Sequence, residues 1–161
     1  MTGVGARALP RGPDRKVVRP RRRRFISTLA GGGTCCAPRG AVIVRDFKDL
    51  VCWRLAYALK CEVVDFTATG PASRDFKYCD QIRDASASAP ANIAEAFGRY
   101  RSRDAARFCE FAIASLEETR NHLIDGRDRA YLTPALCSRL SNLARSAVKT
   151  TKNWMFYLKD C

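Results

Sequence analysis

The stretch Ser88-Ala-Pro90-Ala-Asn-Ile-Ala-Glu-Ala-Phe-Gly98 decides the fold of this chain. Strong helix formers lie on both sides of Pro90, although a proline inside a helix removes a backbone hydrogen bond and costs about 3 kcal/mol. Apolar side chains recur with the period of an α-helix before and after the proline. The residues on this face are Ile82, Ala85, Ala89, Ile93, Ala96 and Phe97. We therefore expect one bent, alanine-lined helix that continues through Pro90 and is held by tight packing.

The polar residues of this stretch have a structural interpretation and a functional one. Glu95 precedes Arg99 by four residues, the spacing at which two side chains pair on one helix face. Asn92 or a serine such as Ser86 or Ser88 is placed to satisfy a carbonyl that Pro90 frees. A carboxylate and an amide beside a helix bend are also candidates for a ligand site or a general base. We favour the structural role for Ser88, Pro90, Asn92 and Glu95.

A first helix is predicted upstream of this stretch. Asp46 is its cap, with Asp49 in the capping-box position three residues later, and Thr69-Gly70-Pro71 ends it. Its predicted apolar face consists of Phe47, Leu50, Val51, Tyr57, Cys61 and Val64. Ser73 is the predicted cap of the next helix, which contains the proline and ends at Gly98.

Two further helices follow. The third begins near Ser102 and ends near Gly126, whereas Thr133 caps the fourth, with Pro134 at the first helical position. The predicted core residues of the third helix are Ala105, Phe108, Ala112, Leu116, Thr119 and Leu123. Those of the fourth helix are Leu136, Leu140, Leu143, Ala147, Trp154 and Leu158. Core residues that recur at intervals of three and four positions are typical of helix bundles, so we predict an all-α four-helix bundle.

The first 45 residues differ in composition from the rest. They carry eleven Lys/Arg against Asp14 alone, so most of the net charge of +13 lies there, together with the runs Arg21-Arg-Arg-Arg24 and Gly31-Gly-Gly33. We predict a disordered basic tail over residues 1–45 and a bundle domain over residues 46–161. Three interpretations of the tail stay open: an arm that binds nucleic acid, a solvated tail without function, or an untranslated segment whose true start is Val42 or Val44.

The cysteine and histidine content argues against metal sites and enzymatic activity. Eight cysteines occur in 161 residues without a C-x-x-C pair, and His122 is the one histidine. Cysteines beside apolar helix faces favour packing in a reducing cytoplasm. Glu118 lies four residues before His122, but a di-iron bundle site needs a second histidine. No stretch approaches the ~20 apolar residues that span a bilayer. We predict a cytoplasmic protein without enzymatic activity, cofactor, metal or membrane partner.

One face of the fourth helix is purely cationic. Nearly opposite the apolar face, at 100° per residue, it carries Arg145, Lys149, Lys152 and Lys159. A second cationic group surrounds the loop before the third helix and consists of Arg99, Arg101, Arg103 and Arg107. One interpretation is a solvated surface. The other is a surface that contacts the phosphates of RNA or DNA without sequence preference.

Several apolar residues lie outside the main apolar faces. They are Trp53 on the first helix and Phe111, Ile113 and Ile124 on the third. Such residues either form a subunit contact or widen the buried face of an internal helix. They support an alternative to nucleic-acid binding, namely a scaffold or partner-binding protein.

Four sequence blocks carry a resemblance to a known family. The blocks are Phe47-Lys-Asp-Leu50-Val-Cys-Trp53, Gln81-Ile-Arg83-Asp-Ala, Ser88-Ala-Pro90-Ala-Asn92-Ile-Ala-Glu95 and Ala114-Ser-Leu-Glu-Glu118. Over about residues 46–160 the chain resembles the small proteins encoded by intervening sequences of bacterial 23S ribosomal RNA genes. The family usually has glycine where Ala96 stands. Since alanine favours helix over glycine by roughly 1 kcal/mol, we expect this substitution to keep the fold and to stiffen the end of the second helix.

The resemblance implies an antiparallel, up-and-down bundle that forms a ring-like homo-oligomer, with a pentamer as the expected ring. The family has no established enzymatic activity. Its relatives include the accessory variability determinant of diversity-generating retroelements, a basic pentamer that works with a reverse transcriptase and nucleic acid. The partners implied are therefore further copies of the chain, RNA or DNA, and a reverse transcriptase.

Overall fold

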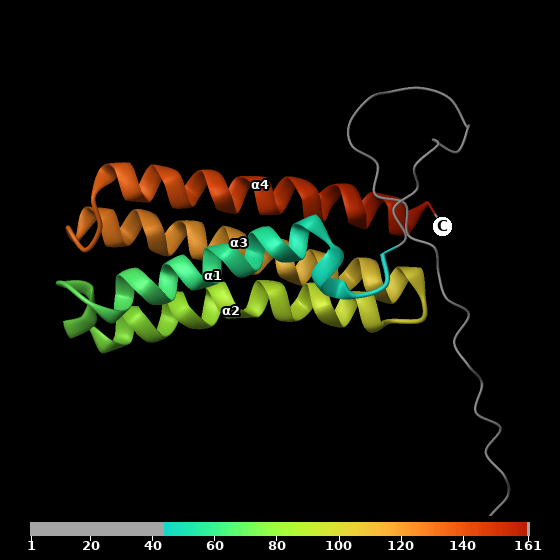
Figure 1. The fold of residues 1–161 in the computed structure, drawn as a ribbon, viewed down its shortest axis with the longest axis horizontal. Coiled ribbons are helices and arrows are strands. Elements are labelled where there is room, and N and C mark those ends of the chain that lie inside the picture. Colours follow the sequence, from blue (N-terminus) through green and yellow to red (C-terminus); the bar gives the residue numbers. More distant parts are fainter. Residues whose placement is uncertain (1–43, 161) are drawn as a thin grey trace, which may run out of the picture.

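The chain forms a bundle of four antiparallel helices that run up and down along one long axis (Figure 1). The computed structural model describes residues 44–160, so the predictions for the tail before Val44 lie outside the described residues. No strand occurs in this described part. The elements are η1 (Phe47–Asp49), α1 (Val51–Ala68), η2 (Ala72–Arg74), α2 (Phe76–Gly98), α3 (Ser102–Asp128) and α4 (Pro134–Lys159). The predicted all-α four-helix bundle is confirmed.

The chain enters the bundle through a capped turn. The N–H of Lys48 donates to Oδ1 of Asp46 over 2.9 Å, and the N–H of Asp46 donates to Oδ2 of Asp49 over 3.3 Å. This reciprocal pair is the predicted capping box, although it caps the 3-10 turn η1, and α1 begins only at Val51. Val44 is already buried in the core. The structured part therefore begins before the predicted boundary at Asp46.

The predicted apolar face of α1 is largely wrong. Leu50 is buried, but Val51, Tyr57, Cys61 and Val64 are exposed. The residues of α1 that enter the core are Cys52, Ala56, Leu59, Val63 and Thr67. Both faces of the helix are apolar, and the face with smaller side chains lets α1 come closer to α2 and α4. The bulkier face is left on the outside of the bundle.

α2 runs through Pro90 without interruption, as predicted. Its predicted inward face is confirmed, with Phe97 half-buried at the edge of the core and the other five residues buried. Pro90 itself is also buried. Because most of these side chains are small, α2 packs closely against the neighbouring helices. The bend in its axis stays a prediction.

A polar link joins α2 to α3 beside the proline. Asn92 donates to the carbonyl and the hydroxyl oxygen of Ser88 over 2.9 and 3.0 Å. The hydroxyl of Ser115 on α3 donates to that of Ser88 over 3.0 Å. Asn92 therefore bonds to a carbonyl one turn back, but Pro90 deprives a different carbonyl, that of Ser86, of its helical donor. These contacts therefore hold α2 against α3 and do not replace the hydrogen bond that Pro90 removes.

Asp75 caps α2 in place of the predicted Ser73. Oδ1 of Asp75 accepts from the N–H of Tyr78 over 3.1 Å, whereas the hydroxyl of Ser73 donates to the carbonyl of Gly70 over 2.8 Å. The prediction is wrong because the short turn η2 contains Ser73 and ends directly before Asp75. The carboxylate is then the first side chain that reaches the open N–H groups of α2.

The third and fourth helices begin and end close to the predicted residues, but the predicted core of α4 is confirmed only in part. Leu140, Ala147 and Leu158 are buried, whereas Leu136, Leu143 and Trp154 are half-buried. α3 begins at Ser102, and its predicted core is buried except for the half-buried Phe108. It ends at Asp128, two residues beyond the predicted end. α4 begins with Pro134, and Oγ1 of Thr133 accepts from the N–H of Leu136 over 3.2 Å as the predicted cap.

Tyr78 crosses from α2 to α3 at Gly126. Its hydroxyl donates to the carbonyl of His122 over 3.0 Å. A Cβ at Gly126 would lie 2.1 Å from the hydroxyl oxygen of Tyr78 and 2.7 Å from Cδ2 of Leu132. The glycine is thus required by the close approach of two side chains.

We expect Gly126→Ala to destabilise the protein by about 1–3 kcal/mol, because overpacking outweighs the roughly 1 kcal/mol that alanine gains over glycine in a helix. Urea denaturation measures the change. Gly98→Ala is the matched control, since no heavy atom lies within 4 Å of a Cβ there, and it should be neutral or stabilising. Unchanged stability of Gly126→Ala would contradict the close approach.

Candidate nucleic-acid interface

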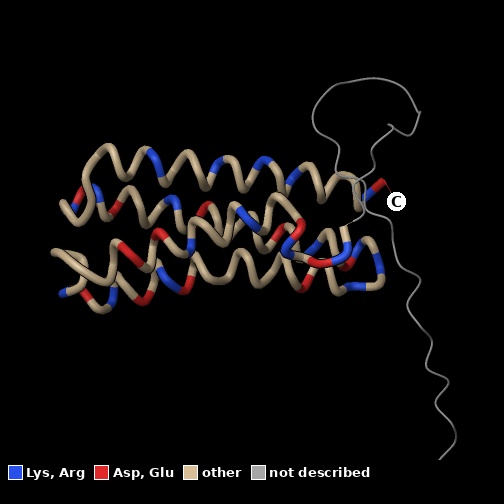
Figure 2. Tube along the Cα trace, in the orientation of Figure 1, with Lys and Arg blue, Asp and Glu red and all other residues tan. Residues whose placement is uncertain are grey.

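One end of the bundle has an excess of positive charge (Figure 2). It contains the start of α1, the loop between α2 and α3, and the end of α4 (Figure 1). Residues 44–59, 88–115 and 147–160 form this half and carry ten Lys/Arg against six Asp/Glu, whereas residues 60–87 and 116–146 carry nine of each. All the excess positive charge of the described part therefore lies in this half. We call it the cationic end, and the other the balanced end.

Four cationic residues lie on one exposed face of α4, a helix that contains no acidic residue. Lys149, Lys152 and Lys159 belong to the cationic end, whereas Arg145 lies one turn further toward the balanced end. Lys159 donates to Oε1 of Glu110 on α3 over 2.8 Å. Lys149 and Lys152 form no ion pair with any residue of the described part. Their charge is therefore available to a partner.

Two arginines of the second predicted group lie against aromatic rings. Arg99 pairs with Glu95, as predicted, and its guanidinium carbon lies 4.3 Å from the ring centroid of Phe108. The guanidinium carbon of Arg107 lies 5.6 Å from the centroid of Phe111. Cation–π contacts of this kind hold the side chains over the start of α3.

Arg101 and Arg103 complete this second group. Both are exposed beside the loop between α2 and α3, and neither forms an ion pair within residues 44–160. The fold thus brings every predicted cationic residue to one end except Arg145. The contact between Lys159 and Glu110 joins the α4 face to α3, the helix that carries Arg103. Lys149, Lys152, Lys159 and the second group therefore lie at the same end of the bundle.

Phe156 is an exposed residue of this face that was not predicted from the sequence. It is 57% exposed on α4, between Lys152 and Lys159. Its spacing from both lysines, four residues and three, already places it on the cationic face. The signal was present in the sequence, but an apolar residue near Trp154 and Leu158 is easily grouped with the core.

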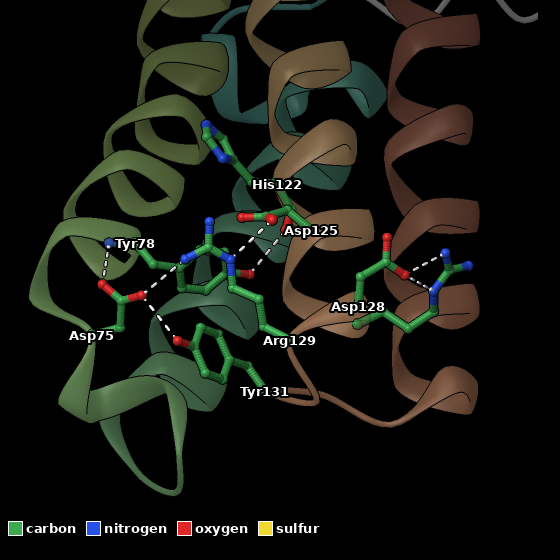
Figure 3. A network of polar contacts seen from close by, with 8 residues as sticks. Asp75, Tyr78, His122, Asp125, Asp128, Arg129 and Tyr131 are labelled. Carbon is green, nitrogen blue, oxygen red and sulfur yellow. Dashed lines mark hydrogen bonds and ion pairs between the residues drawn. The ribbon is translucent and has the colours of Figure 1, made fainter.

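A second cluster of titratable side chains lies at the balanced end (Figure 3). Oδ2 of Asp75 accepts from the hydroxyl of Tyr131 over 2.9 Å and from Nη1 of Arg129 over 3.2 Å. Nε of Arg129 donates to Oδ1 of Asp125 over 2.9 Å. The rings of Tyr78 and Tyr131 meet edge to face, with centroids 5.1 Å apart. The cluster joins the start of α2 to the end of α3.

The charge of Asp75 and the protonated hydroxyl of Tyr78 both favour contacts that hold α2 against α3. We call this cluster of Asp75, Tyr78, Asp125, Arg129 and Tyr131 the clamp. Hydrogen bonds from the Tyr78 N–H and the Tyr131 hydroxyl, together with Arg129, hold the pKa of Asp75 below its ordinary value. Burial raises the pKa of Tyr78, which keeps its hydroxyl a donor to the carbonyl of His122. Among the residues that the structure describes, no three His, Cys, Asp or Glu side chains come together where they would hold a metal ion.

Most described cysteines are core residues. Cys52, Cys79, Cys109 and Cys137 are buried and Cys61 is exposed, all as free thiols. Burial raises the pKa of Cys52 and of Cys109 to about 12, so both stay protonated and behave as small apolar side chains. The predicted packing role is confirmed for the four buried cysteines, and the other three of the chain lie outside the described residues.

These features define a class: a small all-α four-helix bundle whose exposed cations gather at one end. Across residues 44–160, no helix is both long enough and apolar enough to cross a membrane. The chain belongs to the 23S rRNA-intervening sequence protein family, whose model matches residues 48–153 and so extends from η1 into α4. A comparison with curated proteins finds no match. The resemblance inferred from the four sequence blocks is thereby confirmed.

We expect acid to weaken the clamp through Asp75. Because its folded pKa lies below that of an unfolded aspartate, about 3.9, the carboxylate stabilises the fold above that pH, and this contribution is lost as the pH falls through the folded pKa. Asp75→Asn keeps a capping oxygen but does not titrate. Urea denaturation from about pH 7 to about pH 3 should show a shallower decline for Asp75→Asn than for the wild type. Parallel declines would contradict the assignment, and the exposed Asp80→Asn serves as control.

Proposed function

We propose that this protein is a non-enzymatic nucleic-acid-binding protein that acts as a ring-like homo-oligomer. The cationic end is the contact surface, and it binds the phosphates of RNA or DNA without sequence preference. The observation that carries the proposal is the exposure of Lys149, Lys152, Arg101 and Arg103 at one end, each without an ion pair in the described part. Such cations release condensed counterions from a nucleic acid when they neutralise its phosphates.

An exposed apolar stripe on α1 supports the homo-oligomer. It consists of the exposed Tyr57, Cys61 and Val64 and begins at Trp53, which is half-buried against the core. These residues share one side of the helix at spacings of three and four residues. The rings of Trp53 and Tyr57 stack with centroids 4.8 Å apart, yet Tyr57 stays 43% exposed and Val64 40% exposed. A second copy of the chain removes this apolar surface from water. Contacts between unlike surfaces of successive copies close into a ring.

A pentameric ring repeats the cationic end five times. Repetition raises the affinity for one long nucleic acid, because each further contact becomes intramolecular after the first. On the resemblance to the accessory variability determinant of retroelements, a reverse transcriptase is a further proposed partner. The free cysteines suit the reducing cytoplasm that we propose as its compartment.

The alternative function is a scaffold that contacts protein partners and no nucleic acid. The stripe on α1 and the exposed Phe111 and Ile124 on α3 favour it. In that case the lysines of α4 only keep a surface solvated. Neutralising Lys149 and Lys152 should therefore weaken nucleic-acid binding under the first function, whereas under the alternative there is no such binding to weaken.

We expect Lys149→Gln combined with Lys152→Gln to weaken binding to every RNA or DNA sequence alike. The slope of log K against log salt should become shallower by about 2, since each lost phosphate contact contributes roughly 0.9. Fluorescence anisotropy of a labelled oligonucleotide, titrated between about 50 and about 200 mM salt, measures this slope.

The matched control removes the same charge at the balanced end. Arg74→Gln combined with Lys77→Gln changes two exposed cations there and should leave the slope as in the wild type. An equal loss in both double variants would show that net charge, and not the cationic end, controls affinity. Unchanged affinity of the α4 variant would remove the proposed contact.

We expect Tyr57→Glu combined with Val64→Glu to dissociate the oligomer, because two carboxylates then replace apolar surface at the subunit contact. Sedimentation velocity at micromolar concentration should give a ring for the wild type and a monomer for the variant, with equal helicity by circular dichroism. Phe76→Glu is the control, because Phe76 is 78% exposed but lies on α2 at the balanced end. A monomeric wild type would rule out the ring.

A further inference from the structure

Phe156 places a bare aromatic ring among the cations of α4. It is 57% exposed, and its neighbours one turn away on the same face are Lys152 and Lys159. Within the described part, no other ring packs against it and no cation lies over it. A base of a bound nucleic acid therefore has access to the face of this ring.

Two other exposed phenylalanines lack this combination. The ring of Phe111 is contacted by the ring of Phe108, with centroids 5.7 Å apart, and by the guanidinium of Arg107. Phe76 is more exposed than Phe156, but it lies at the balanced end, where cations do not outnumber acidic residues. Phe156 combines free ring faces with flanking positive charge.

The geometry of α4 suits one nucleic-acid strand. Lys149 and Lys159 are ten residues apart, which is about 15 Å along a helix at 1.5 Å per residue. Successive phosphates of one strand can contact the cations along this length of α4, and Phe156 lies between Lys152 and Lys159. In a duplex the base faces are already stacked on one another, whereas a single strand offers them to an aromatic side chain.

We propose that the preferred ligand of the cationic end is single-stranded nucleic acid, with one unpaired base stacked on Phe156 and the adjacent phosphates on Lys149 and Lys152. This inference rests on the proposed nucleic-acid binding and makes it more specific. Stacking tolerates any base because every base has a π face. The site therefore distinguishes single strands from duplexes and does not read sequence.

The test compares Phe156 variants on matched ligands. The probes are a labelled single-stranded RNA of about twelve nucleotides, the DNA of the same sequence, and the corresponding DNA duplex, a length within the range of single-strand sites. Phe156→Ala and Phe156→Leu should raise the Kd for both single strands by about tenfold and the Kd for the duplex by less than about twofold. Phe156→Tyr should keep wild-type affinity. The salt slope should not change, because no phosphate contact is lost.

Phe76→Ala is the matched control and should leave every Kd unchanged. Equal losses on single strands and duplex, or no loss on either, would overturn the stacking role while leaving the proposed nucleic-acid binding intact. A change of oligomeric state in Phe156→Ala, measured by sedimentation, would identify Phe156 as a subunit contact instead. Wild-type protein that binds none of the three probes would overturn the proposed function and this inference together.

Discussion

Close packing along the small-residue face of α2 holds the bundle together around Pro90. The side chains of Ala85, Ala89 and Ala96 are buried, so the backbone of α2 approaches its neighbours closely. This packing offsets the roughly 3 kcal/mol that a proline costs inside a helix. The hydrogen bond between Ser115 and Ser88 fastens α2 to α3 beside the proline. As a result, α2 stays intact through Pro90 and runs along the bundle.

The length of α2 determines where the cationic residues meet. Because the helix continues to Gly98, the loop after it opens at the end of the bundle where α4 finishes (Figure 1). Arg101 and Arg103 then lie at the same end as Lys152 and Lys159, although they are far apart in the sequence. At the opposite end, the contacts of Asp75 with Arg129 and Tyr131 hold the start of α2 against the end of α3 (Figure 3). The fold thus brings two separate basic segments to the same end of the bundle.

Periodicity was sufficient to predict most of the fold, and its failures have physical causes. The inward face of α2 was predictable because only one face of that helix is apolar along its length. α1 has two apolar faces, and the choice between them depends on how closely Cys52 and Ala56 let other helices approach. The cap at Asp75 depends on the turn before it, and the need for glycine at Gly126 depends on Tyr78 of another helix. The spacing of apolar residues encodes neither a short local turn such as η2 nor a contact between two helices.

Photo-crosslinking shows which residues of the protein contact a bound nucleic acid. The intact protein is irradiated with bound single-stranded RNA that contains a photoreactive base, and the crosslinked peptides are identified by mass spectrometry. We expect adducts within residues 147–160 of α4 and around the loop between α2 and α3, because the exposed cations gather there. Adducts confined to residues 60–87 and 116–146, or evenly spread over the bundle, would contradict it.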